Sequence, residues 1–168
     1  QNEHIKATYF AARAAIQEGN EKVMAKYIQR AGEIDRGNPY AIVASAWGAM
    51  AAQEIEEAHE LAAQALSVEA NFAPALFISG RLHDVKGEAS QAREAYEAYL
   101  KQKPYDMDKA VYLYQALMTL GDVEEAEKTI NELYKKRTHH PLINLYKAQI
   151  EYEKGNYVEA QDFSKRVL

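Results

Sequence analysis

The chain of 168 residues contains no cysteine, and it has only four prolines and eight glycines. Without cysteine there is no disulfide, no thiolate nucleophile and no cysteine-ligated zinc. So little proline and glycine argues against disorder and against a fold of many short strands. No apolar run approaches the roughly 20 residues that span a bilayer, so we expect no membrane insertion by this segment. The net charge of −5 argues against nucleic acid as a partner.

Motifs of catalysis and cofactor binding are also missing from the sequence. It has no glycine-rich phosphate loop, no G-x-S-x-G and no H-E-x-x-H. Adjacent residues point apart, so His139 and His140 are expected in a solvated loop, and His83 falls at a position expected to be core. We therefore predict that the chain is not an enzyme and holds neither a metal nor a cofactor.

What the sequence does have is a repeat. Gly87, Gly121 and Gly155 are 34 residues apart (121 − 87 and 155 − 121), and the same step backwards reaches Gln53 and then Gly19. A slot for a small residue follows each of these positions after five residues, and it holds Met24, Ala58, Ala92, Ala126 and Ala160. A fixed period of this length indicates one supersecondary unit copied end to end.

The period divides the chain into five repeats, and each is predicted to be two helices joined by a tight turn. The repeats span 5–38, 39–72, 73–106, 107–140 and 141–168. In the third repeat we expect helices over 75–86 and 90–103, with Gly87 ending the first at positive φ. The segments are rich in strong helix formers and show no period-two alternation, so the prediction is all-α. We expect residues 1–168 to form a single array that is part of a longer one.

These residues resemble the tetratricopeptide repeat (TPR) family. The third repeat carries most of the family pattern, in Leu76, Gly80, Gly87, Ala92, Tyr96 and Pro104. The resemblance implies a right-handed superhelical solenoid of about five helix-turn-helix repeats that acts as a protein-protein interaction scaffold. Phrases such as Asn71-Phe72-Ala73-Pro74-Ala75 also look like bacterial PEP-CTERM or exopolysaccharide-type TPR lipoproteins. That narrower likeness favours a periplasmic or outer-membrane-attached protein, active in envelope or export assembly, over a cytoplasmic one.

The resemblance further implies which residues line the concave face, because the family places positions 2, 5, 9 and 12 of each repeat there. The residues predicted to bind a peptide are Tyr9, Arg13, Tyr40, Val43, Trp47, Met50, Phe77, Arg81, Asp84, Gln115 and Met118. The same positions in the later repeats include Asp108, Val111, Leu142, Leu145, Gln149 and Tyr152. Aromatic residues and arginine dominate binding hot spots. The alternative is that the aromatic side chains are core, since Tyr40 and Trp47 share one helix face in either case.

Two alternatives to a peptide scaffold follow from the same residues. The segment could be a structural spacer within a larger TPR protein, with no ligand in its groove. The sixth position of each repeat holds no asparagine, so the family's carboxylate clamp for chaperone tails is not expected. The last helix carries an apolar stripe through Tyr157, Phe163 and Val167 that lacks a polar cap. We therefore expect either a longer array or self-association through this uncapped C-terminal helix.

Overall fold

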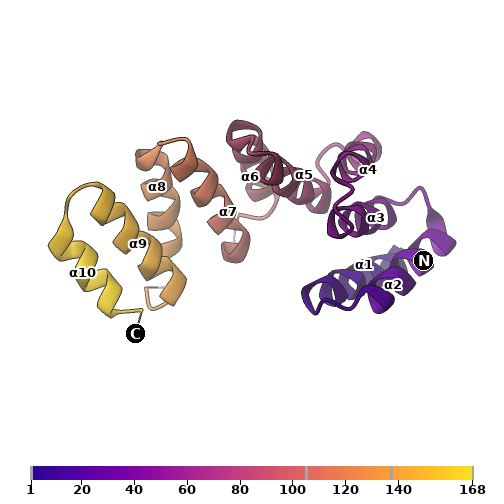
Figure 1. Ribbon diagram of the computed structural model, residues 1–168, viewed down its shortest axis with the longest axis horizontal. Helices are drawn as coiled ribbons and strands as arrows, with labels where there is room; N and C mark the ends of the chain where they lie inside the picture. Colours follow the sequence, from indigo (N-terminus) through magenta and orange to yellow (C-terminus); the bar gives the residue numbers. More distant parts are fainter. Residues whose placement is uncertain (1, 105, 137, 168) are drawn as a thin grey trace. The chain divides into compact units, whose positions relative to one another are not determined.

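The computed structural model describes residues 2–104, 106–136 and 138–167, and these residues form ten helices and no strand. The helices follow one another in pairs joined by short turns (Figure 1). The all-α prediction and the five helix pairs are confirmed. The pairs are α1 (Asn2–Gln17) with α2 (Glu21–Asp35), α3 (Pro39–Ala51) with α4 (Ile55–Val68), α5 (Ala73–Lys86) with α6 (Ala89–Gln102), α7 (Met107–Thr119) with α8 (Val123–Tyr134), and α9 (Pro141–Glu153) with α10 (Tyr157–Lys165).

The turn inside each pair places one residue in the left-handed region of backbone space. Four of the five are glycines, as predicted, and Gln53 occupies the fifth place with a φ of 65°. An L-residue with a side chain pays a steric cost in this conformation that glycine does not. The turn of the second repeat therefore has the same backbone conformation as the others, although its residue is not glycine.

Replacing Gln53 with glycine should stabilise the protein. We expect the free energy of unfolding to rise by about 1 kcal/mol, because glycine has no Cβ atom to clash with the backbone in the left-handed conformation. Urea unfolding followed by circular dichroism measures the change. The matched control is Gly121→Ala: no atom lies within 4 Å of its added Cβ, so its expected loss comes from the backbone alone. A stabilising effect of both substitutions would contradict the argument.

Asparagine, aspartate and proline begin the helices. The side chains of Asn20, Asn38, Asp106 and Asp122 each accept a hydrogen bond from a backbone N–H of the first turn that follows. Pro74 lies in the first turn of α5, where its missing N–H costs nothing. For this reason α5 begins at Ala73, two residues before the start predicted from the sequence.

Four of the five small-residue slots are buried where two paired helices cross, and the fifth, Met24, is half-buried. Ala58, Ala92 and Ala126 are fully buried, and Ala160 is 7% exposed. In the third repeat Gly80 on α5 faces the ring of Tyr96 on α6, and a Cβ at Gly80 would lie 2.7 Å from Tyr96 Cδ1. The small residues thus let the paired helices approach each other closely.

The chain divides into two compact units, each with its own core. The N-terminal unit, Gln1–Lys103, contains α1 to α6, and the C-terminal unit, Pro104–Leu168, contains α7 to α10. In the N-terminal unit the first helices pack on one another, α1 on α3 and α3 on α5. In the C-terminal unit α8 packs on both α7 and α9, while α7 and α9 approach each other less closely. None of the described helices has both the length and the apolar character needed to cross a bilayer.

Candidate functional site

The inner positions of the N-terminal unit form a row of touching aromatic rings. The ring centroids of Tyr9 and Tyr40 are 5.4 Å apart, and those of Trp47 and Phe77 are 6.1 Å apart. Tyr9, Trp47 and Phe77 are each less than 7% exposed, and Val43 is fully buried. These side chains join α1, α3 and α5, so they serve as core between successive first helices, which is the alternative that the spacing left open.

Arg13 covers the buried Trp47. Its guanidinium carbon lies 3.5 Å from the centroid of the indole ring, a cation–π arrangement. The indole N–H is buried without a hydrogen-bond partner of ordinary geometry, although it lies near the Tyr9 hydroxyl. Burial raises the pKa of the Tyr9 phenol, and the Arg13 charge opposes this rise. A ligand of this unit would therefore meet the guanidinium first and the rings beneath it only if Arg13 moved.

The remaining predicted residues of this unit are more accessible. Tyr40, Met50 and Arg81 are half-buried, and Asp84 is exposed. Asp84 accepts a hydrogen bond from the Tyr96 hydroxyl, so its carboxylate is oriented toward α6. The accessible chemistry at the inner positions of the N-terminal unit is thus charged and polar, over an apolar floor.

The inner positions of the C-terminal unit line a groove of about 410 Å³ between α7 and α9. Four residues that the repeat register assigns to the inner face lie in it: Asp108, Val111, Gln115 and Leu142. Met118, also predicted to bind, is half-buried but does not line the groove. Further along α9, Leu145 and Tyr152 are 45% and 62% exposed, so an apolar stripe continues from the groove.

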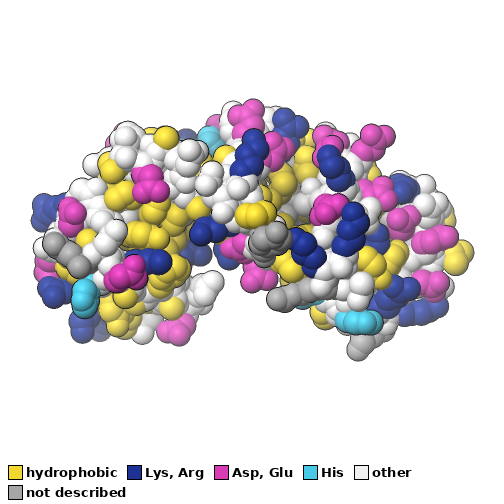
Figure 2. Space-filling model, turned by 180° about the vertical axis from the view of Figure 1, so that it is seen from behind, with side chains coloured by type: hydrophobic (Ala, Val, Ile, Leu, Met, Phe, Trp, Pro, Cys, Tyr) yellow, Lys and Arg dark blue, Asp and Glu magenta, His cyan; other side chains and the backbone are white. Residues whose placement is uncertain are grey.

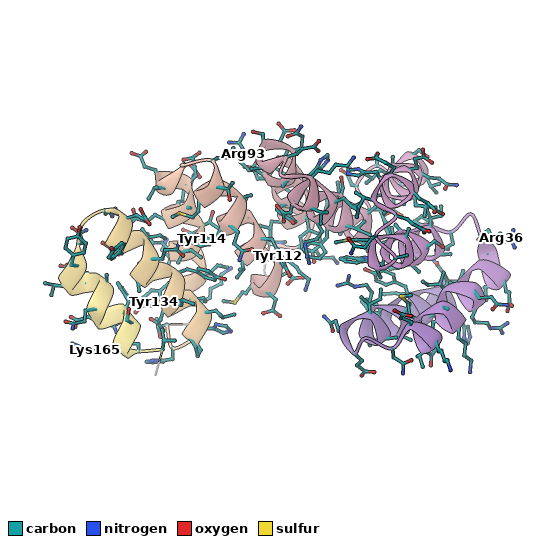
Figure 3. The ribbon with its side chains drawn as sticks, in the orientation of Figure 1. Arg36, Arg93, Tyr112, Tyr114, Tyr134 and Lys165 are labelled. Atoms are coloured by element: carbon teal, nitrogen blue, oxygen red, sulfur yellow. The ribbon has the colours of Figure 1, made fainter. Side chains whose placement is uncertain are left out.

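Next to this groove, the eighth position of a repeat holds a large residue where the first three repeats have a small one. Ala12, Ala46 and Gly80 occupy the eighth position of the first three repeats, whereas the fourth repeat has Tyr114 there. Tyr114 is 1% exposed, and its ring lies 4.5 Å from the ring of Tyr146 on α9. The two tyrosine rings therefore lie between α7 and α9, which approach each other less closely than α1 and α3 or α3 and α5 do. Figure 3 labels Tyr112 and Tyr114 on α7.

The structure adds groove residues that were not predicted as binding residues. Met107, Tyr112, His140, Ile143 and Tyr146 line the groove as well. Tyr112 and Tyr146 both stand at the sixth position of their repeats, and only these two repeats have tyrosine there. Tyrosine at the sixth position of these two repeats was the signal in the sequence that could have pointed to the groove.

Titratable groups cluster at the junction of α4, α5 and α6, away from this groove. His83 Nδ1 lies 2.6 Å from Glu88 Oε2, and the rings of His59 and His83 meet edge to face at 5.0 Å. Burial lowers the pKa of His59, and the charges of Lys86 and His83 lower it further. Within the described ranges no three acidic or histidine side chains are arranged to hold a metal ion. These contacts connect α4, α5 and the start of α6.

Similarity of fold extends over nearly the whole chain. PilF of Pseudomonas aeruginosa superposes with a TM-score of 0.83 at 18% identity, covering 98% of this chain and 75% of PilF. MamA of Desulfovibrio magneticus RS-1 gives a TM-score of 0.76 at 12% identity, covering 98% and 93% of the two chains. A chain of the APC/C Cut9–Hcn1 hetero-tetramer gives a TM-score of 0.79 at 15% identity, covering 93% of this chain and 30% of that one.

Sequence comparison assigns the family. No curated protein matches the chain in sequence. The sequence profile of the tetratricopeptide repeat matches residues 43–106 and 113–165. These ranges cover most of the chain and carry the helix pairs, positive-φ turns and buried alanine slots described above. The chain therefore belongs to the tetratricopeptide repeat family.

Proposed function

We propose that this chain is a protein-interaction scaffold that binds a segment of a partner protein at the inner positions of its first helices. The observation that carries the proposal is the groove between α7 and α9, because residues in repeat register line it and leave it open. Figure 2 shows hydrophobic side chains reaching the surface among charged ones on both units. Exposed apolar surface rimmed by polar groups is typical of protein-binding sites.

The groove favours an apolar side chain next to a hydrogen-bonding or cationic group. Its walls are mostly apolar, from Val111, Leu142 and Tyr146, and its charged carboxylate is that of Asp108. Asp108 is exposed and makes no ion pair within the described ranges. The proposed ligand is therefore an extended or helical segment that inserts an aliphatic or aromatic residue and places a donor near Asp108.

A charge placed in the groove tests this function. Peptides selected from a displayed library for binding to the wild-type chain supply the ligand, and isothermal titration measures their affinity. Leu142→Arg, at a side chain that is 47% exposed, should weaken binding about tenfold or more, because it charges an apolar contact. Val158→Arg is the matched control, since Val158 is 70% exposed on α10 and does not line the groove. If both variants bind the selected peptides as the wild type does, the ligand site lies elsewhere.

Trp47 reports on the N-terminal unit in the same titration. The chain has one tryptophan, and its indole is covered by Arg13. A ligand that engages Arg13 should displace the guanidinium and change the emission of Trp47. Unchanged emission would show that the ligand does not engage Arg13.

The location of the protein, its self-association and a spacer role are further proposals. A role in envelope or export assembly, with a periplasmic or outer-membrane-attached location, rests on the likeness of residues 71–75 to bacterial lipoproteins of this family. Self-association through α10 is consistent with the exposure of Tyr157 and Val158. A spacer without a groove ligand is the alternative function, and a failure to select any peptide would favour it.

A further inference from the structure

A large side chain near the end of the second helix is missing from the first repeat. Leu66, Leu100 and Tyr134 follow one another at the repeat distance of 34 residues (100 − 66 and 134 − 100). One step earlier stands Gly32, on α2. Leu66, Leu100 and Tyr134 are all half-buried.

In the C-terminal unit, Tyr134 shows what this position contacts. Its ring centroid lies 6.0 Å from that of Phe163, and Lys147 Nζ lies 5.2 Å from the ring centroid. The Tyr134 hydroxyl accepts a hydrogen bond of 2.9 Å from Arg166. Figure 3 labels Tyr134 on α8, and its partners come from α9 and from the end of α10. Its side chain thus fills the space between three helices.

The counterparts of these partners line an open cavity in the N-terminal unit. Three repeats, or 102 residues, separate Tyr134 from Gly32, and the same step takes Lys147 to Ser45, Phe163 to Leu61 and Arg166 to Gln64. Gly32, Ser45, Leu61 and Gln64 all line a cavity of about 470 Å³ between α2, α3 and α4. The cavity is therefore the place that the Tyr134 side chain occupies in the other unit.

Packing does not require glycine at this position. A Cβ at Gly32 would meet only Arg36 Cγ, at an ordinary contact distance of 3.7 Å. Glycine in a helix interior lowers stability relative to alanine, and an unfilled space adds to the loss. The contrast is Gly80, whose missing side chain makes room for Tyr96. The opening at Gly32 is a stability cost without a packing reason, which points to an occupant from outside the chain.

The chemistry of the cavity describes that occupant. Ile28, Ile42 and Leu61 form an apolar floor, and Gln64 stands where Arg166 donates to the tyrosine hydroxyl. Two charged side chains line the cavity: Glu33, whose carboxylate lies 3.3 Å from the Arg30 guanidinium, and Arg36 at the end of α2, where Figure 3 labels it. The Arg36 side chain is exposed and makes no ion pair with any described residue. An unpaired arginine favours a carboxylate, which it can bind with two parallel hydrogen bonds.

We propose that the cavity between α2, α3 and α4 binds a tyrosine side chain of a partner protein, within an acidic segment whose carboxylate pairs with Arg36. The partner's tyrosine takes the place that Tyr134 takes in the C-terminal unit, and Gln64 donates to its hydroxyl. This site is separate from the groove between α7 and α9, and it uses second helices that the proposed function does not.

Filling the cavity tests the site without weakening the fold. Para-cresol, the side chain of tyrosine, is titrated at millimolar concentrations into ¹⁵N-labelled protein. We expect shifts of the backbone amide signals of Ala41, Ile42 and Leu61 in the wild type and none in Gly32→Leu. The same variant should raise Tm by roughly 2–4 °C, because it restores a helix-forming side chain to the open position. Equal shifts in both proteins, or a Tm that does not rise, would overturn the proposal.

The acidic context is tested with a pair of blocked peptides, Glu-Glu-Tyr-Glu-Glu and Glu-Glu-Ala-Glu-Glu. The tyrosine peptide should bind at least tenfold more tightly than the alanine peptide, and Arg36→Gln should remove most of this binding. Leu142→Arg, in the other groove, should leave it unchanged, which separates this site from the proposed function. Equal affinity of the two peptides would overturn the proposal. So would a wild-type dimer that Gly32→Leu dissociates in sedimentation, because a second copy would then be the occupant.

Discussion

Tyr114→Ala is expected to lower the free energy of unfolding by about 3–5 kcal/mol, the range for removing a large aromatic ring from a core. Tyr114 is 1% exposed and lies against Tyr146 on the neighbouring first helix. Its removal leaves a cavity between α7 and α9 that the helices can close only by moving together. Urea unfolding followed by circular dichroism measures the loss. Because Tyr146 lines the groove, peptide affinity should fall in the same variant.

Removing the hydroxyl of Tyr114 should have the opposite effect on stability from removing its ring. The oxygen is buried and has no hydrogen-bond partner among the described residues. An unsatisfied buried polar group costs about 1–3 kcal/mol, so Tyr114→Phe should raise the free energy of unfolding. Burial, with the nearby Tyr146 and Glu153, raises the pKa of this phenol, so it should stay protonated when exposed tyrosines ionise. A Tyr114→Phe variant that is as unstable as Tyr114→Ala would show that the hydroxyl is bonded.

Gly80→Ala should destabilise the N-terminal unit by roughly 1–3 kcal/mol through overpacking. The added Cβ would lie 2.7 Å from Tyr96 Cδ1 and 2.9 Å from Tyr96 Cζ, well inside contact distance. The ring cannot swing away, because Tyr96 is fully buried and its hydroxyl is bonded to Asp84. Thermal unfolding of the variant measures the loss.

Gly32→Ala is the control for this substitution. It makes the same change in a helix interior, but its Cβ meets only Arg36 Cγ at 3.7 Å. Alanine is favoured over glycine in a helix by about 1 kcal/mol, so this variant should be more stable than the wild type. The two substitutions should therefore have opposite signs. The same sign for both would mean that the contacts of Gly80 and Gly32 do not decide their effects.

Most of the fold could be predicted because the repeat pattern reflects local preferences of the backbone and of helix packing. Glycine at positive φ, alanine at helix crossings and proline in a first turn each act within one or two helices. Gln53 shows how strong the period is: the repeat predicted a turn there without glycine, and the structure has the same backbone conformation. The start of α5 was less predictable, because proline is tolerated at more than one place in a first turn.

The candidate site could be predicted only as a set of positions. The register placed Asp108, Val111, Gln115 and Leu142 on an inner face, and they do line one groove. The same register placed Tyr9, Val43, Trp47 and Phe77 there, and these side chains are buried between first helices. An aromatic residue at a given position of a helix can face a neighbouring helix or solvent, depending on how close the neighbour lies. Whether any of the predicted residues contacts a ligand stays a prediction.

The sequence by itself determined the helix pairs and their turns, because these depend on residues close together along the chain. Only the tertiary structure decided which inner positions are covered and which are open. The packing of α1 on α3 and of α3 on α5 buries their aromatic side chains, whereas Tyr114 and Tyr146 lie between α7 and α9, where the groove is open. The cavity at Gly32 has the opposite origin, because a side chain is missing there. One side chain's volume, set against neighbours from other helices, decides whether a space is core or a binding site.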